Sequence, residues 1–394
     1  MNLRVLMIAP TPFFGDRGCH VRIMEEIRAL GEAGVRVLLL TYPGGKSPPD
    51  ISIRRIKGPD FLKEERIGPH AGKYILDASM VIMAVREAKS YNPDIIHGHL
   101  HEGCLIGWFA GKILNKPVVF DYQGSLAGEM AHHGFLTPGS LPFAAFRSIE
   151  RVINRLPDVV LSSSGAMLDG NFKRNGVEVR IVPDAVDMRE FSPLEKDAKL
   201  ASSLGLPSDR PICAFLGLLN RYQGVDMLLE SVAVFKAQYG PKAHFLVMGY
   251  PGVERYEFQA ASLGIKEMVT FTGRLPYDMA PTYLNLGDMA IAPKIAATES
   301  NGKIIDYMAC GLATVALDTG VNREILGETG LYVVWREREK ETAVGIADAV
   351  AKLAEDESLR KKLGRMGRER AEKLFNRENL AKKLLDAYQS VKDE

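Results

Sequence analysis

The chain has 394 residues, 46% of them hydrophobic and 25% charged, a composition typical of a globular protein with two or three domains. Its 50 basic and 49 acidic residues nearly cancel, which excludes a strong overall field that would attract nucleic acid or an anionic bilayer. Four scattered cysteines without a CxxC pair indicate reduced thiols and argue against a disulfide framework.

The first residues predict a buried parallel strand rather than a signal peptide. Leu3–Ala9 (LRVLMIA) is an apolar run of strand length, and the loop PTPFFGDRG follows it. Apolar residues then recur at helical spacing in Cys19–Leu30, and Val35–Tyr42 (VRVLLLTY) predicts a second strand. Because the first run is interrupted by Pro10 and no run has the ~18 residues of a membrane span, we expect a cytoplasmic protein.

Three histidines alternate in the segment PDIIHGHLHEG. His97, His99 and His101 could form a metal site if they lay at the end of a strand. The alternative is that the histidines alternate simply because one side of the strand faces solvent. His101 and Glu102 would then begin a helix that faces solvent. We therefore predict no metal site.

The segment Leu136–Pro157 (LTPGSLPFAAFRSIERVINRLP) places Phe143 and Phe146 beside Arg147 and Arg151. Such a basic amphipathic helix can contact a membrane that holds a lipid-linked acceptor. The alternative is an ordinary helix that packs on the core and turns its basic face to water, and this alternative is favoured.

A second doubly wound unit begins at Pro211. A strand at Pro211–Gly217, a helix from Val225 to Phe235 and a strand at Ala243–Gly249 repeat the pattern of the first half. A polar, proline-punctuated segment before Pro211 serves as the linker. We expect two Rossmann-like domains, residues 1–189 and 190–375, facing across a cleft in which ligands lie at the carboxyl ends of the strands.

The stretch Thr298–Ala316 (TESNGKIIDYMACGLATVA) places two carboxylates, Glu299 and Asp306, on either side of Lys303. It lies between two apolar runs that predict strands, so it belongs in the cleft. Asp306 can accept hydrogen bonds from the vicinal hydroxyls of a ribose, and Glu299 can do so for a second sugar. A nucleoside diphosphate sugar presents hydroxyls, phosphates and hydroxyls in that order.

The centre of this stretch predicts a helix N-terminus that favours an anion. Ser300 suits the N-cap, Asn301 follows it, Gly302 permits close backbone approach, and Lys303 adds a full positive charge. The alternative is that the two acids only stabilise the start of the helix. We favour ligand binding because acid, glycine, lysine and acid occur together after a strand.

At this point the chain resembles a retaining glycosyltransferase of the GT-B fold, in the large GT4 family. The motifs that carry the resemblance span most of the chain and occur in the family's order. They are GDRG (15–18), PDIIHGH (93–99), VPDAVDMREFSP (182–193), FLGLLNRYQGVDMLLESV (215–232), VTFTGRLP (269–276) and the stretch 298–316. The resemblance implies an N-terminal acceptor-side domain, a nucleotide-sugar-binding domain, and a final helix (376–394) that crosses back to the first domain.

Several positions depart from the family pattern. The family usually has two glutamates separated by seven residues, so the first would fall on Thr298 rather than Glu299. Leu218 and Gln223 stand where the family has an arginine and a lysine for the diphosphate. The resemblance then implies that other residues supply the positive charge there, namely Arg221, Lys294 and Lys303.

Further roles follow from the resemblance by position. The residues assigned to catalysis are Glu299, His99 and Gln123, of which Gln123 stands where the family has an acceptor-side histidine. Arg274 and Leu275 would lie near the nucleobase, the alternative for Arg274 being a surface salt bridge. Gly18 would let the diphosphate approach the first helix, the alternative being a simple tight turn.

The resemblance implies transfer of a sugar from a UDP-, GDP- or ADP-linked donor to an acceptor sugar or lipid-linked glycan, with retention and without metal or other cofactor. We expect the protein in the cytoplasm, with peripheral contact at the inner face of the cell membrane. The expected role is in glycan, glycolipid or polysaccharide synthesis. A dehydrogenase is disfavoured because the first loop lacks GxGxxG. A GT-B nucleotide-sugar epimerase and an inactive partner subunit stay open, the latter because of Leu218 and Gln223.

Overall fold

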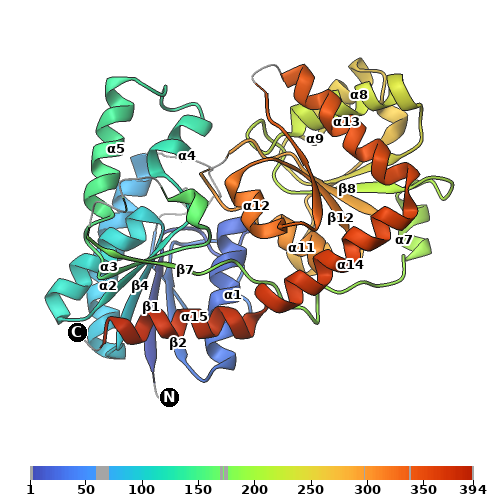
Figure 1. Ribbon diagram of the computed structural model, residues 1–394. Helices are drawn as coiled ribbons and strands as arrows, with labels where there is room; N and C mark the ends of the chain where they lie inside the picture. The colour runs from blue at the N-terminus through green and yellow to red at the C-terminus, as the bar shows by residue number, and fades with distance from the viewer. Residues whose placement is uncertain are drawn as a thin grey trace. The chain divides into compact units, whose positions relative to one another are not determined.

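The computed structural model describes residues 3–58, 71–168, 172, 176–296, 298–336 and 339–392. Contacts divide the chain into two units (Figure 1). Unit 1 comprises Met1–Asp184, Thr298–Ser300 and Arg377–Glu394, and unit 2 comprises Ala185–Ala297 and Asn301–Asn376. The chain therefore passes between the units at four places.

Unit 1 is built on a parallel sheet whose described strands run in the order β3-β2-β1-β4-β5-β6-β7. The order reverses between β1 and β4, which is the switch point where ligands bind in such folds. The strands are β1 (Arg4–Ala9), β2 (Arg36–Thr41), β3 (Ile53–Arg55), β4 (Ile95–His99), β5 (Val118–Tyr122), β6 (Val159–Ser162) and β7 (Glu178–Ile181). The helices are α1 (Gly18–Glu32), α2 (Ala71–Tyr91), α3 (Leu100–Leu114), α4 (Leu126–His132), α5 (Leu141–Ile153), the 3-10 turn η2 (Gly165–Met167) and α15 (Arg377–Ser390).

Unit 2 repeats this plan with a parallel sheet whose described strands run in the order β10-β9-β8-β11-β12-β13. Its switch point lies between β8 and β11. The strands are β8 (Ile212–Leu216), β9 (His244–Met248), β10 (Val269–Gly273), β11 (Met289–Ala292), β12 (Ala313–Leu317) and β13 (Gly330–Val333). The helices are α7 (Ala198–Ser203), α8 (Val225–Tyr239), α9 (Val253–Ser262), η3 (Lys266–Met268), η4 (Tyr277–Met279), α10 (Ala280–Leu284), α11 (Lys303–Ala309), α12 (Gly320–Leu326), α13 (Glu339–Glu355) and α14 (Glu357–Leu374).

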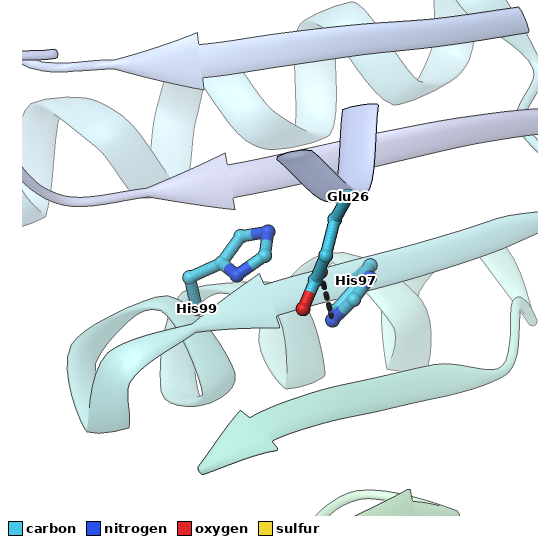
Figure 2. A group of neighbouring side chains, drawn as sticks. All are labelled: Glu26, His97 and His99. Carbon is cyan, nitrogen blue, oxygen red and sulfur yellow. Dashed lines mark ion pairs between the residues drawn. The ribbon is translucent and has the colours of Figure 1, made fainter. Parts of the chain in front are cut away.

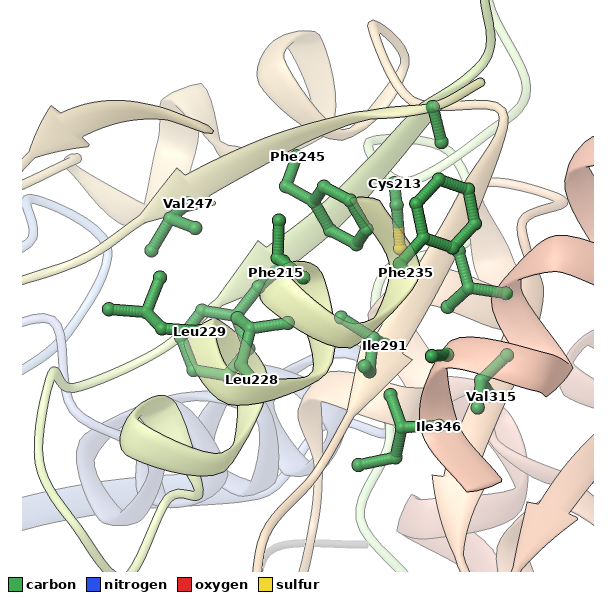
Figure 3. Close-up of a cluster of buried hydrophobic side chains, with 14 of the residues drawn as sticks. Cys213, Phe215, Leu228, Leu229, Phe235, Phe245, Val247, Ile291, Val315 and Ile346 are labelled. Carbon is green, nitrogen blue, oxygen red and sulfur yellow. The ribbon is translucent and has the colours of Figure 1, made fainter. Parts of the chain in front are cut away.

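Apolar runs become the central strands because both faces of each sheet are covered by helices. In unit 2, Phe215 and Phe245 of neighbouring strands meet Phe235 of α8 and Ile346 of α13 in one buried cluster (Figure 3). Unit 1 has a corresponding cluster beneath α2 and α3. Two parallel Rossmann-like sheets therefore confirm the predicted fold class.

Helix α15 belongs to unit 1, although it follows the last residue of unit 2. It packs along α1, and Arg377 at its start binds the buried Glu25 carboxylate through two hydrogen bonds of 2.6 and 2.9 Å. Near its end, the Tyr388 hydroxyl lies 2.8 Å from Nδ1 of His97 in β4. These contacts confirm that the final helix returns to the first unit.

The helix predicted to begin around Ser300 begins later. Helix α11 starts at Lys303 and has Gly302 at its N-cap, so the prediction of Ser300 as N-cap is wrong. The reason is that Glu299 forms an antiparallel bridge with Gly124, which holds the chain extended at that point. The Ser300 hydroxyl donates instead to the Asp184 carboxylate.

Replacing Arg377 by methionine should destabilise the protein because it leaves the buried Glu25 without its bidentate partner. Breaking a buried ion pair from one side typically costs about 3–5 kcal/mol, which would lower the Tm by roughly 10 °C. Thermal unfolding followed by circular dichroism measures this shift. Arg365→Met, which removes an exposed pair with Glu369, is the matched control and should shift the Tm by about 1 °C or less. Equal shifts in the two variants would contradict the assigned role of α15.

Candidate functional site

Most of the residues predicted for the site lie in segments that follow the carboxyl ends of the strands, in both units. Unit 1 holds Gly18, His99, Gln123, Glu299 and Ser300, and unit 2 holds Arg221, Arg274, Leu275, Lys294, Asn301, Gly302, Lys303 and Asp306.

The site end of unit 1 is organised by a buried arginine that the sequence did not single out. Arg22 of α1 binds both carboxylate oxygens of Asp121 in β5, at 2.7–3.0 Å, and one oxygen of Asp184 at 2.6 Å. It also lies 3.1 Å from Glu26, one turn along α1. Burial disfavours the charge, but the attraction of these carboxylates outweighs it and raises the pKa of Arg22.

Two residues predicted to be catalytic meet at Asp121. Nδ1 of His99 lies 3.0 Å from Oδ2 of Asp121, and the Gln123 amide donates to the same oxygen at 2.7 Å. Although burial opposes ionisation of Asp121, Arg22 and the hydrogen bond from His99 hold its pKa well below the ordinary range. Asp121 is therefore a carboxylate that fixes the orientation of both side chains. Its place at the end of the apolar run VVFDY was the signal that could have revealed it.

Among the described residues, one group has the composition of a metal site: Glu26, His97 and His99 (Figure 2). All three side chains are buried, the two rings stack with centroids 4.5 Å apart, and the ligand atoms lie within 4.8 Å of one another. However, Oε1 of Glu26 already lies 3.1 Å from the Arg22 guanidinium. Burial and the nearby Asp121 also raise the pKa of Glu26 well above its ordinary value, which favours the neutral acid over a metal-binding carboxylate. The group is better explained as part of the buried network around Arg22.

The expected solvent-facing arrangement of these histidines is wrong. Helices α1 and α15 cover β4 on the side where His97 and His99 point. Glu26 of α1 and Tyr388 of α15 both contact the His97 ring. His101, expected in solvent, is buried against the rings of Phe120 and Tyr122. Burial lowers the pKa of His101 to about 4, so this ring is neutral at pH 7.

Glu299 lies in unit 1 against the segment that follows β5. Its carboxylate is 3.5 Å from Nδ1 of His132, at the end of α4, and its backbone pairs with Gly124. Thr298 lies next to the same segment, because a side chain added at Gly128 would come within 3.2 Å of the Thr298 hydroxyl. Whether the predicted catalytic position is Glu299 or Thr298, it therefore lies beside the segment between β5 and α4.

Gly18 is the first residue of α1, and no described atom lies within 4 Å of the place where a side chain would begin. The backbone at the start of this helix is thus open to close approach.

Lys303 is the central cation of the site in unit 2. Its ammonium group donates to Oε1 of Gln223 at 2.6 Å and lies over the Phe215 ring, 4.5 Å from the centroid. Gln223 precedes α8 and Lys303 begins α11, so this hydrogen bond joins the loops on either side of the switch point. Gly217 permits the contact, because a Cβ there would meet Nζ of Lys303 at 2.6 Å.

Lys303 is poorly compensated in this position. Burial, followed by repulsion from Lys294, lowers its pKa to about 7, while Asp306 opposes the shift. Lys294 is itself buried in the loop after β11. Two buried lysines that repel one another at a switch point form a site that an anion would stabilise.

The remaining predicted residues of unit 2 surround this centre to different degrees. Asp306 is buried and accepts a hydrogen bond from the Tyr277 hydroxyl at 3.4 Å. Asn301 is buried and donates to Asn322. Arg274 stacks on the Tyr250 ring and precedes Leu275. Arg274 and Leu275 follow β10, Asn301 precedes α11, and Asp306 lies in the first turn of α11.

Arg221 lies at the surface. It is exposed and pairs with Glu339 at 2.9 Å. The surface position makes Arg221 a weaker anion ligand than Lys303, because solvent screens its charge.

Two family models match the chain. The model for group 1 glycosyl transferases matches residues 196–370, and the model for the glycosyl transferase 4-like domain matches residues 17–184. The matches correspond closely to the two units.

Curated relatives include a synthase and a glycosyltransferase. The alpha-maltose-1-phosphate synthase of Mycolicibacterium smegmatis is 25% identical, and the match covers 99% of this chain and 100% of the relative. The 2-deoxystreptamine N-acetyl-D-glucosaminyltransferase of Streptomyces fradiae is 24% identical, with 81% and 78% covered.

Solved structures share the fold over almost the whole chain. Sucrose-phosphate synthase of Thermosynechococcus elongatus superimposes with a TM-score of 0.82 at 20% identity, covering 99% of both chains. The Anabaena protein HepE in complex with UDP-glucose gives 0.75 at 16% identity, covering 99% of this chain and 100% of its own.

The proton of Lys303 offers a direct test of the site in unit 2. We expect its side chain to titrate with a midpoint near pH 7, because burial and Lys294 disfavour the ammonium form. Side-chain NMR of isotopically labelled lysine measures the midpoint, and loss of the signal in Lys303→Arg assigns it. A Lys303 midpoint above about 9 would contradict this description of the site.

Proposed function

The chain belongs to the group 1 glycosyltransferases of family GT4, and we propose that it moves a sugar from a nucleoside diphosphate to an acceptor hydroxyl with retention. It has the GT-B fold, which its two Rossmann-like sheets share with sucrose-phosphate synthase. The observation that carries the proposal is the poorly compensated Lys303 beside Lys294 at the switch point of unit 2. In the proposed reaction, the diphosphate is the anion that this site binds and releases.

In the proposed donor complex, Lys303 exchanges its hydrogen bond with Gln223 for phosphate oxygens. The diphosphate supplies the negative charge that the surrounding neutral groups lack, so its binding would raise the pKa of Lys303 and restore the full ammonium charge. Gln223 stands where a second cation is usual in the family, and the buried Lys294 would supply that charge. The neutral substitution at Gln223 thus need not make the chain an inactive subunit.

The nucleoside end of the donor is assigned to Asp306 and to the loop after β10. Asp306 would exchange the weak 3.4 Å contact with Tyr277 for the vicinal hydroxyls of the ribose. The backbone of Leu275 would meet the nucleobase, with Arg274 beside it. UDP-glucose is the first donor to test, because HepE is solved with it and a trehalose-6-phosphate protein of E. coli is solved with a fluorinated analogue.

On the acceptor side, we propose that His99 and Gln123 orient the acceptor hydroxyl. Both are fixed by Asp121, and Asp121 is fixed by Arg22, so their positions need no reorganisation during reaction. Nε2 of His99 and Oε1 of Gln123 have no hydrogen-bond partner among the described residues. Oε1 of Gln123 can accept a hydrogen bond from a sugar hydroxyl, and so can Nε2 of a neutral His99 whose Nδ1–H donates to Asp121.

We also propose that the reaction needs no metal and takes place in the cytoplasm. The two lysines would offset the diphosphate charge without a divalent ion, so activity should survive EDTA. The four cysteines are free thiols, three of them buried, which fits a reducing compartment.

The donor assignment predicts that UDP binding is coupled to protonation of Lys303. Lys303→Ala should weaken UDP far more than uridine, by about tenfold or more, because a charge-assisted contact is lost. Above pH 7 the free lysine loses its proton, so UDP affinity should fall by up to about tenfold per pH unit in the wild type and much less in the variant. Calorimetry in buffers of different ionisation enthalpy measures the proton uptake. Lys361→Ala is the control, and equal losses for UDP and uridine would contradict the phosphate role.

The catalytic assignment predicts that Glu299→Gln lowers kcat by at least ~10-fold, about 1.4 kcal/mol, with little change in UDP affinity. The negative charge would stabilise the oxocarbenium-like transition state more than the ground state. Steady-state kinetics with the best donor and NMR of the product anomer measure both rate and stereochemistry.

Two further variants separate the alternatives. If Thr298→Ala is impaired and Glu299→Gln is not, the catalytic register lies one residue earlier. If His132→Ala reproduces the loss in Glu299→Gln, the carboxylate acts only by holding His132. A product that is an altered nucleotide sugar, with no transfer to any acceptor, would identify an epimerase instead.

A further inference from the structure

The hydrogen-bond ladder between β8 and β11 is interrupted before these two strands end. Among the described residues, the pairing joins Cys213 and Ala214 of β8 to β11 and goes no further. Continuing the same register would place Leu216, the last residue of β8, opposite Ala292, the last residue of β11. On its other side, β8 stays paired with β9 as far as Leu216. The interruption therefore lies at the switch point of unit 2, on the β11 side alone.

The backbone of Leu216 needs a partner on that side. Successive residues of a strand direct their N–H and C=O groups alternately to the two neighbouring strands. The N–H of Gly217 donates to Met248 of β9 at 3.0 Å. The carbonyl of Ile212 accepts from Asp288, which precedes β11, at 2.8 Å. Leu216 alternates with Gly217 and has the same parity as Ile212, so its N–H and C=O face β11 and require a substitute for the missing pairing.

The hydroxyl of Tyr307 is that substitute. It accepts a hydrogen bond from the Leu216 N–H at 2.8 Å and donates a weaker one to the Leu216 carbonyl at 3.5 Å. Tyr307 belongs to α11, and its side chain is fully buried. Burial raises the pKa of Tyr307 well above its ordinary value, so the hydroxyl keeps its proton and can serve both backbone groups.

The two chain segments meet again beyond the interruption. The N–H of Ile295, in the loop after β11, donates to the Tyr222 carbonyl in the loop after β8 at 3.0 Å. Gly224 permits this approach, because a Cβ there would lie 2.0 Å from the carbonyl oxygen of Pro293. The interruption is thus local, with hydrogen-bonded backbone before and after it and the Tyr307 hydroxyl within it.

Lys303 lies beside the same interruption. It precedes Tyr307 by one turn of α11, so the two side chains share a face of that helix. Its ammonium group lies 4.5 Å from the centroid of the Phe215 ring, and a Cβ at Gly217 would come within 2.6 Å of it. The residues on either side of Leu216 therefore contact Lys303, while Leu216 itself is bound by Tyr307. The distance between α11 and the end of β8 depends on that hydroxyl.

We propose that Tyr307 is a positioning residue for the diphosphate site, because its hydroxyl keeps β8 and β11 unpaired at the switch point and thereby places Lys303. Tyr307 does not touch the donor in this proposal and acts through the lysine. The identity of the anion rests on the proposed function, whereas the placement of Lys303 does not. The alternative is that the hydroxyl only satisfies a buried backbone group, which would affect stability and leave Lys303 unchanged.

Tyr307→Phe tests the proposal, because it keeps the ring and removes only the hydroxyl. We expect the Leu216 amide proton to exchange with solvent at least ~10-fold faster, since its partner is lost. The NMR midpoint of Lys303 should move by about one pH unit toward the ordinary lysine value, because the ammonium group is no longer held in its buried position. Affinity for UDP should fall about fivefold and affinity for uridine should not change. Both affinities are measured well below the Lys303 midpoint, where the lysine is protonated in both proteins.

Tyr332→Phe is the matched control in unit 2. The Tyr332 hydroxyl donates to the carbonyl of Gly327, which precedes β13 and so lies at the amino ends of the strands, away from Lys303. This change also removes one hydroxyl-to-backbone hydrogen bond. It should leave the Lys303 midpoint and the UDP affinity at their wild-type values, whatever its effect on the Tm.

Two results would overturn the proposal. One is a lower Tm in Tyr307→Phe with an unchanged Lys303 midpoint and UDP affinity, which would assign the hydroxyl to Leu216 alone. The other is an equal effect of Tyr332→Phe on the midpoint and on UDP. If the wild-type protein binds no UDP, the proposed donor is wrong, and the Lys303 midpoint still decides whether Tyr307 places the lysine.

Discussion

The site end of unit 1 depends on one buried positive charge. Arg22 stands on a helix that packs against the sheet, where a guanidinium is stable only if carboxylates surround it. Asp121 and Asp184 supply that negative charge from a strand and a loop, and the buried Glu26 lies beside the guanidinium on the same helix. Because the charges cannot separate without leaving one of them buried alone, the strand ends that carry His99 and Gln123 are held in one arrangement. The polar groups of the proposed acceptor site are thus rigid for electrostatic reasons.

In unit 2, by contrast, the buried charge of Lys303 is not balanced by paired carboxylates. Lys303 is buried beside a neutral amide, an aromatic ring and another lysine, so the protein leaves its ammonium group undercompensated. An arginine could not respond in this way, because its pKa stays far above neutrality. Arg22 is fully paired with carboxylates, whereas Lys303 can gain or lose its proton near pH 7. This difference matches the two tasks proposed for the units. One orients a neutral hydroxyl, and the other captures and releases an anion.

Local patterns predicted the elements and the fold class, but not the contacts between distant segments. The apolar runs at β1, β2, β8 and β9 were recognisable because parallel strands are buried on both faces. The start of α11 was misplaced because Glu299 pairs with Gly124, and no local propensity reports that pairing. Arg22 was overlooked because a single basic residue beside Ile23 resembles the edge of an amphipathic helix. His101 was expected in solvent because the packing of α3 on β5 is a tertiary property. Gln223 was noticed as a departure, but its bond to Lys303 became apparent only in three dimensions.

The position of α15 has a consequence for how the protein is made. Arg377 completes the ion pair with Glu25 on the first helix, so unit 1 combines segments that are far apart in the sequence. On a ribosome that adds roughly 5–20 residues per second, unit 1 waits about 10–40 s between synthesis of Asp184 and the arrival of its last helix. During that time Glu25 lacks its partner and the side of α1 that α15 will cover is open. Unit 2 contains no segment beyond Asn376 and can complete its core first. The C-terminal unit would therefore finish folding before the N-terminal one, the reverse of the usual order for a chain synthesised from its N-terminus.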